Sequence, residues 1–273
     1  MLKKFLFSSL AFLMVIMGCG YTYNSPNSSP YTENFYGAWY NGAGQTEDVY
    51  QTIYFDEYES TREFIDITCP SYDTITQENS CAPMAATIVI AYYDVTLTNL
   101  IPNFEPGYTY NGQFRFYPNS NTTLHLKEHL YDLMGTNESG AGTSVSQFKS
   151  GMTEYVNGQG YSIQYQSIGR NVSTARSYFQ NETPVVLFLN SFEYYTIAGL
   201  VFQDNQVLTH GIKSSSMHVV VAYGYQEFRF YENNQLTRTD KYYIVSFGNG
   251  TYGYLLINNL NTINEAYAIT IYW

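Results

Sequence analysis

Charged residues are scarce in this chain of 273 residues, at 13% of the total. Basic residues are the scarcer kind, with 12 Lys and Arg against 23 Asp and Glu and a formal net charge of −11. This balance argues against nucleic-acid binding, which needs a basic surface. Disorder, a coiled coil and a fibrous repeat are excluded as well, because hydrophobic residues make up 45% of the chain. The sequence predicts one large folded domain.

Long hydrophobic runs are lacking except near the N-terminus. There, two Lys precede an apolar run over residues 5–17, which is too short to span a membrane and typical of a secretory signal. Ile16-Met17-Gly18-Cys19 then resembles the lipidation motif of bacterial lipoproteins. We therefore expect a signal peptide over residues 1–18 and a lipid on Cys19 that anchors the protein at the extracellular face of the bacterial membrane. The alternative is an ordinary signal peptide with an incidental Cys.

The segment after the signal has little periodicity. Residues 19–60 are rich in Asn, Ser, Pro, Gly and Tyr, which predicts a tether and an extended lead-in, with the folded domain over residues 61–273. A propeptide is the alternative interpretation of the same segment. The chain also contains 30 Tyr, which favours a β-rich fold with exposed sheet surface, because the Tyr hydroxyl tolerates water.

Within the domain, the patterns predict helices first and strands last. Apolar residues at helical spacing indicate helices over residues 81–93, 124–134, 145–156 and 172–179. The first of these is apolar on nearly all sides and is therefore predicted to be buried. Runs rich in Val, Ile and Tyr indicate strands over residues 184–189, 218–225, 241–247, 252–258 and 266–272. This order predicts an α+β fold in which helices, including a buried one that carries Cys81, precede a C-terminal antiparallel sheet.

Of only three Cys, Cys81 is the one placed for chemistry. It lies at the predicted N-terminus of the buried helix, where unpaired amides and the helix dipole favour the thiolate. Gln77, four residues earlier, is placed to donate to an oxyanion beside the backbone amide of Cys81. The alternatives are a packed structural Cys with a polar loop Gln, and a disulfide between Cys69 and Cys81 in an oxidising compartment.

Only four His are available as a base for a nucleophilic Cys. His218 begins a buried-looking strand, and its separation from Cys81, 218 − 81 = 137 residues, lies within the roughly 130–150 found in papain-like enzymes. His210, in a stretch predicted to be a loop, is the second candidate. His125 and His129 are four residues apart on one helix face, but the Glu of the zincin motif is missing, which favours a solvated face. We expect no metal and no cofactor.

Two segments carry a family resemblance. Residues 77–94, with Gln, then Cys-Ala-Pro-Met-Ala and an apolar run ending in Tyr-Tyr-Asp, are similar to the Cys-bearing helix of bacterial papain-like cysteine peptidases of the C39-like family, and residues 217–225 resemble its His strand. There is also some likeness to the streptopain type. The likeness covers residues 65–273. It implies a papain-like fold and a secreted cysteine peptidase that hydrolyses peptide bonds through a Cys81–His218 dyad and a thioester.

The partners follow from the same resemblance. It implies peptide or protein substrates, no nucleic acid, and contact with the membrane through the lipid anchor only. We also expect a monomer. A related possibility within this class of fold is an enzyme that acts on the cell wall, but the Asp-Cys-Ser motif of common wall amidases is absent.

The third catalytic position departs from the family pattern. The family has an Asn that orients the His, shielded by a Trp, whereas the stretch here is Val245-Ser246-Phe247-Gly248-Asn249-Gly250. Ser246 stands at the Asn position and can accept a hydrogen bond from the imidazole, so it is the first candidate for the orienting residue. Asn249 is the alternative, although Asn-Gly also favours a hairpin turn. The departure leaves open a catalytically degenerate, papain-like binding lipoprotein.

Overall fold

The computed structural model describes residues 46–65, 69–72, 79–118, 120–138 and 142–273. Its helices are α3 (Cys81–Asp94), α4 (Asn121–Leu133), α5 (Val145–Gly158), α6 (Val172–Phe179) and the short 3-10 helix η2 (Leu260–Thr262). Its strands are β1 (Thr46–Tyr54), β2 (Glu57–Phe64), β3 (Gly107–Tyr110), β4 (Gln113–Phe116), β5 (Ser162–Ser167), β6 (Val185–Leu189), β7 (Phe192–Gln203), β8 (Gln206–Ser214), β9 (His218–Glu232), β10 (Gln235–Ser246), β11 (Tyr252–Leu256) and β12 (Ile263–Tyr272). In these parts of the chain, no helix is long and apolar enough to cross a membrane.

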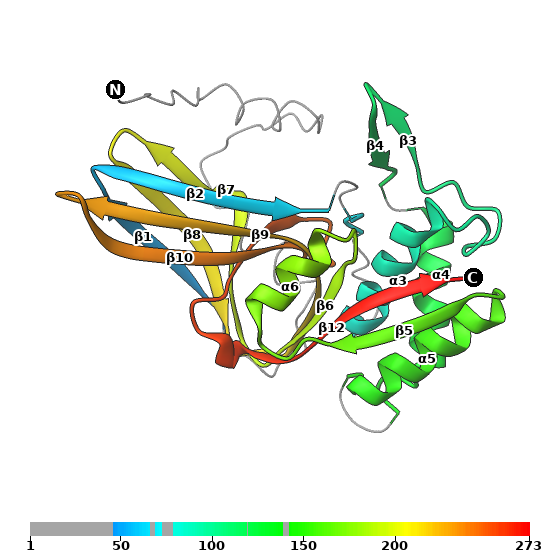
Figure 1. Ribbon diagram of the computed structural model, residues 1–273. Helices are drawn as coiled ribbons and strands as arrows, with labels where there is room; N and C mark the ends of the chain where they lie inside the picture. The colour runs from blue at the N-terminus through cyan, green and yellow to red at the C-terminus, as the bar shows by residue number, and fades with distance from the viewer. Residues whose placement is uncertain (1–45, 66–68, 73–78, 119, 139–141) are drawn as a thin grey trace, which may run out of the picture. The chain divides into compact units, whose positions relative to one another are not determined.

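Helices α4, α5 and α6 begin where side chains can bind their free amides. Ser120 and Ser144 each form a capping box at the start of α4 and α5, and Asn171 caps α6. Helix α3 has no side-chain cap, but the Ser80 carbonyl accepts the Met84 amide at 2.9 Å. Nearly all side chains of α3 are buried, because the helix packs against β9, α4 and α5 (Figure 1).

One antiparallel sheet of ten strands dominates the described residues. Its order is β1-β8-β7-β11-β10-β9-β6-β12-β5, and β2 also pairs with β9. With four α-helices beside it, this is the predicted α+β class (Figure 1). The predicted order of elements was wrong, however, because β1 and β2 precede α3, the separate β3–β4 hairpin follows it, and β5 lies between α5 and α6.

Strand β9 pairs with two different strands, β6 and β2, along one of its edges. Its first residues, His218 to Ala222, pair with β6, and its later residues pair with β2 along the same edge. The change of partner falls at Gly224, where a Cβ would lie 2.8 Å from the Cβ of Phe64 and 2.9 Å from the Glu63 carbonyl oxygen. A side chain at residue 224 would therefore push β2 away, so glycine permits the close approach.

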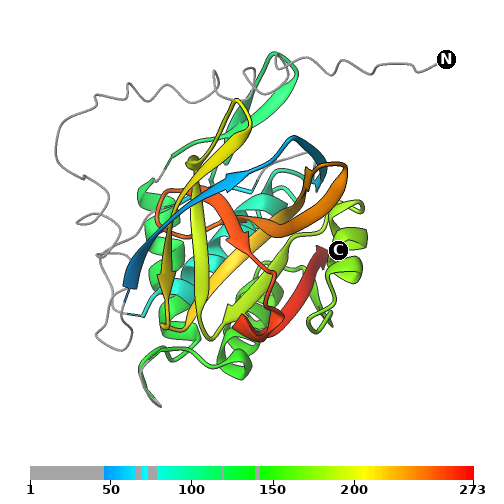
Figure 2. The ribbon, with the colours of Figure 1, turned by 90° about the vertical axis from the view of Figure 1, so that its left-hand side faces the viewer.

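Residues 46–60, which the sequence analysis assigned to the lead-in, belong to this sheet. β1 pairs with β8 over its whole length and β2 pairs with β9, so the consecutive strands β1 and β2 join two distant members of the sheet. Figure 2 looks onto this end, with the blue strands lying among the yellow and orange ones. Their side chains are mostly exposed, which is why they lack a strong hydrophobic pattern.

Candidate active site

Cys81 is the first residue of α3, and its side chain is half-buried. The backbone N–H of Val219 lies close enough to the Cys81 sulfur to lower the pKa of its thiol. Val219 is the second residue of β9, so its amide places the start of β9, and with it His218, beside the N-terminus of α3. Two residues chosen from the sequence, Cys81 and His218, are thereby brought to neighbouring positions.

The electrostatic state of Cys81 differs from the sequence expectation. Burial raises the pKa of its thiol, whereas the amides of Val219, Ala82 and Cys81 itself lower it by a smaller amount. The amides at the helix start thus act in the predicted direction, but desolvation of the charged form is the larger effect. The resting thiol is therefore protonated at neutral pH.

His218 is buried, with 5% of its surface exposed, and its ring is held on two sides. Its Nε2 atom lies 3.1 Å from the carbonyl oxygen of Phe247. The ring of Phe247 stacks on the imidazole with centroids 4.7 Å apart, and Phe192 lies at 5.9 Å. Burial lowers the pKa of His218 to about 4, although the bond to the Phe247 carbonyl acts in the opposite direction. The imidazole is therefore neutral at pH 7.

Ser246 and Asn249 bind other groups than His218. The buried hydroxyl of Ser246 donates to the carbonyl of Pro70 at 2.7 Å. The side-chain oxygen of Asn249 accepts from the amide and the hydroxyl of Thr251, within the turn between β10 and β11. Ser246 therefore holds the segment that leads toward Cys81, and Asn249 stabilises a hairpin turn. Neither contact supports the predicted role of orienting the base.

The remaining Cys and Gln candidates are Cys69, Gln77 and Cys19. Cys69 and Cys81 are both free thiols, so the alternative disulfide is not formed. Cys69 is fully buried, which raises the pKa of its thiol well above the ordinary value. Gln77, the predicted oxyanion donor, and Cys19, the predicted lipidation site, lie outside the described residues.

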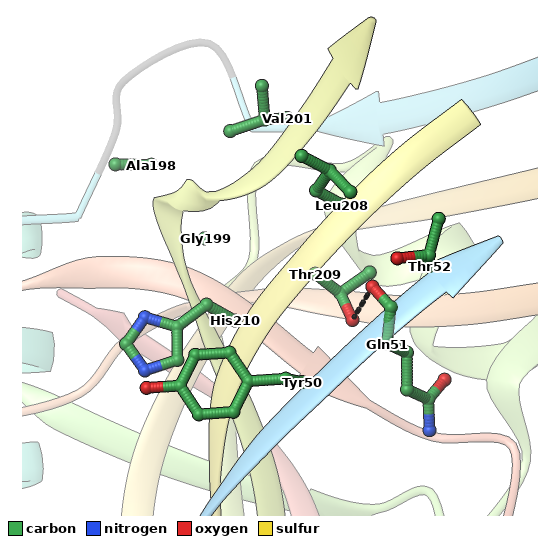
Figure 3. A pocket seen from close by; sticks show the side chains of 9 residues that line it. All are labelled: Tyr50, Gln51, Thr52, Ala198, Gly199, Val201, Leu208, Thr209 and His210. Atoms are coloured by element: carbon green, nitrogen blue, oxygen red, sulfur yellow. Dashed lines mark hydrogen bonds between the residues drawn. The ribbon is translucent and has the colours of Figure 1, made fainter. Parts of the chain in front are cut away.

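His210, the second candidate base, lies on a strand rather than in a loop. It belongs to β8, which pairs with β1 and β7, and these two ladders order a sequence of low strand propensity. Three strands of the sheet separate β8 from β9. His210 stacks on Tyr50 at 4.4 Å and borders a hollow of about 320 Å³ (Figure 3). Tyr50 lies on β1, and so does Asp48, whose carboxylate is 3.6 Å from the His210 Nε2.

The other two His lie on α4. His125 and His129 are both exposed, and the His129 ring contacts Tyr155 at 6.0 Å. Across the described ranges, no group of three or more His, Cys, Asp or Glu is placed to hold a metal ion.

Three contributors to the site were missed by the sequence analysis. The amide of Val219 and the carbonyl of Phe247 are main-chain groups, which every residue type can supply, so no residue pattern points to them. Phe192 is the first residue of β7, a strand that the sequence analysis did not predict. The sequence did offer one signal for this part of the site. Phe247 is an aromatic residue directly after Ser246, the predicted orienting residue.

The sequence of this chain matches a known protein family. Residues 69–259, more than two thirds of the chain, match the family described as "Peptidase_C39 like family". The chain therefore belongs to the C39-like family of cysteine-type peptidases, and the predicted family and enzyme class are confirmed. Peptides or proteins are the class of substrate that this family implies.

One similar solved structure is xylellain, a cysteine protease from Xylella fastidiosa. The two sequences are 12% identical, and the match covers 77% of this chain and 85% of the xylellain chain, with a TM-score of 0.35. None of the curated proteins matches the chain.

The Ser246 contact predicts a loss of stability. Ser246→Ala leaves the buried Pro70 carbonyl without its donor, so we expect the free energy of unfolding to fall by about 1–3 kcal/mol. Ser177→Ala is the matched control, since Ser177 also donates to a carbonyl at 2.7 Å but is exposed, and it should cost less than about 0.5 kcal/mol. Urea denaturation of both variants measures the difference, and equal losses would contradict the assigned role.

Proposed function

We propose that the protein hydrolyses peptide bonds with Cys81 as the nucleophile and His218 as the general base. The observation that carries this proposal is the packing of α3 against β9, where the Val219 amide acts on the Cys81 thiol, because it places the strand that begins with His218 beside the helix that begins with Cys81. Membership of a cysteine peptidase family supports the same assignment. A Cys-His pair of this kind can act without a strong third residue.

The pKa values define how the proton moves in the proposed reaction. At neutral pH the thiol is protonated and the imidazole is neutral, since burial raises the pKa of Cys81 and lowers that of His218. His218 therefore takes the thiol proton as the sulfur attacks the peptide carbonyl. The amine then leaves with a proton from His218, which forms a thioester. A water molecule then gives a proton to His218 and its oxygen attacks the thioester carbonyl. The C–S bond breaks, the carboxylic acid product leaves, and the Cys81 sulfur takes the proton back from His218.

When the sulfur attacks, the oxygen of the peptide carbonyl becomes negatively charged. This oxyanion needs hydrogen-bond donors. We assign this role to the backbone amide of Cys81, at the N-terminus of α3, and to the side chain of Gln77. Amides at a helix start are directed outward and carry no intrahelical partner, which suits a negative charge that develops in the transition state.

Hydrolysis by this pair predicts a selective loss of activity. Cys81→Ala should abolish cleavage of a fluorescently labelled denatured protein, and His218→Ala should lower kcat/KM at least about 100-fold because the general base is lost. Cys69→Ala and His210→Ala, which alter the other described thiol and the second candidate base, should retain the wild-type order of magnitude. If none of the four substitutions changes the measured rate, the proposal fails. If the wild type cleaves no substrate, the binding lipoprotein becomes the better interpretation.

The lowered pKa of His218 predicts the acid limb of the pH profile. Only the neutral imidazole accepts a proton, so kcat/KM should fall to half near pH 4 rather than near pH 6.5. The sign for stability is separate: protonating a His whose folded pKa is lowered destabilises the fold as the pH falls below about 6.5. Near-UV circular dichroism across the range therefore serves as the control for unfolding. A half-point at pH 6 or above with an intact fold would contradict a resting neutral pair.

We also propose that Cys19 carries a lipid after removal of residues 1–18, and that the enzyme acts at the extracellular face of the membrane. The signal-like segment and the motif ending at Cys19 support this location. Expression in a bacterium supplied with a labelled fatty acid should label the wild type and not a Cys19→Ser variant. Equal labelling of both would overturn the anchor.

A further inference from the structure

The contact at Nε2 determines which nitrogen of His218 is basic. A neutral imidazole carries one N–H, on either Nδ1 or Nε2. A carbonyl oxygen can only accept a hydrogen bond, and the Phe247 oxygen lies 3.1 Å from Nε2. The hydrogen is therefore on Nε2, which leaves the lone pair of Nδ1 to accept a proton. A hydroxyl such as that of Ser246 would not make this choice, because it can both donate and accept.

The carbonyl is fixed by the contacts of Phe247 itself. The Phe247 amide donates to the Thr251 carbonyl at 3.1 Å, closing the turn between β10 and β11. Its ring is fully buried against His218, Phe192 and Tyr194. These contacts hold the amide and the ring of Phe247 in place beside the imidazole.

Gly248 sets the plane of the peptide that contains this carbonyl. It follows Phe247 with φ +79°, a conformation that side-chain-bearing residues rarely adopt. A Cβ at this position would also lie 3.2 Å from the Cγ of Met84, on the first turns of α3. Glycine thus permits both the turn and its close contact with the helix that begins with Cys81.

We propose that the main-chain carbonyl of Phe247, held in place by Gly248, is the group that orients His218, in place of a side chain at residue 246 or 249. This inference rests on the proposed role of His218 as the base. The backbone oxygen belongs to an amide, as does the side-chain oxygen of Asn, so it supplies the same kind of acceptor. Phe247 and Gly248 are positioning residues in this assignment, since they act through the imidazole.

The tautomer of His218 tests the orientation without any measurement of activity. In the full chain labelled with ¹⁵N-histidine, His218 at neutral pH should show a protonated Nε2 and an unprotonated Nδ1, with its signals assigned by their loss in His218→Gln. A protonated Nδ1, or an even mixture of both tautomers, would overturn the inference. Because this readout is independent of turnover, it remains decisive even if the protein cleaves no peptide.

A pair of glycine substitutions separates orientation from turn strain. Gly250 has φ +76° in the same turn, and its amide binds the Tyr72 carbonyl rather than any group on His218. Gly248→Ala should lower kcat about 10- to 100-fold with KM within about twofold, and it should shift His218 toward the tautomer mixture. Gly250→Ala carries similar backbone strain and should leave kcat within about threefold and the tautomer unchanged.

The outcomes of this pair are distinct. Equal losses of kcat in the two variants, with an unchanged His218 tautomer in both, would show that the turn matters only for folding and would overturn the inference. If Gly248→Ala does not fold, the tautomer of the wild type decides the question. If the wild type has the predicted tautomer but Cys81→Ala does not reduce cleavage, the orientation stands and the proposed nucleophile fails.

Discussion

The packing of the first turn of α3 against the first residues of β9 is the contact on which the candidate site depends. The Val219 amide reaches the Cys81 sulfur across it. β9 cannot slide at this point, because residues 218–222 pair with β6 and the last two of them also pair with β10. A shift of one residue would turn His218 to the opposite face of the sheet. The pairing of β9 therefore fixes the geometry of nucleophile and base together.

The hairpin of β10 and β11 holds both sides of this contact. Three hydrogen bonds join it to residues 69–72, from the Ser246 hydroxyl, the Gly250 amide and the Tyr252 hydroxyl. Between these anchors, Phe247 contacts the ring and Nε2 of the proposed base. The segment that precedes the nucleophile and the group that faces the base are thus supported by one turn.

The sequence predicted the helices and strands whose formation depends on nearby residues. Helices α4 and α5 combine helical spacing of apolar residues with a Ser at the start, and β6 is an uninterrupted apolar run, so each could be recognised. β1 could not, because its side chains are mostly exposed and its structure comes from pairing with β8, which is distant in the sequence. The abundance of Tyr was interpreted as exposed sheet, which holds for Tyr50 and Tyr54 but not for the many Tyr that lie in the core.

The same distinction applies to the site. Cys81 and His218 could be proposed from the sequence because their chemistry belongs to their side chains and the numbers of Cys and His are small. The surrounding packing and the main-chain groups that act on Cys81 and His218 could not be predicted from the sequence. Desolvation depends on the packing of the whole domain, and the direction of the Phe247 carbonyl depends on a turn closed by Thr251. Ser246 was chosen by its position in a pattern, and its hydroxyl is directed at a different carbonyl.

Burial and main-chain dipoles together determine what kind of Cys-His pair this is. Among the described residues, burial has the largest effect on both pKa values, and backbone amides at Cys81 and the Phe247 carbonyl at His218 oppose it. Burial favours the uncharged forms at rest. The amides directed at the sulfur interact most strongly once negative charge develops there, and the carbonyl interacts most strongly once the imidazole is protonated. Contacts that strengthen as charge forms stabilise the transition state more than the resting enzyme, which is the condition for lowering the barrier.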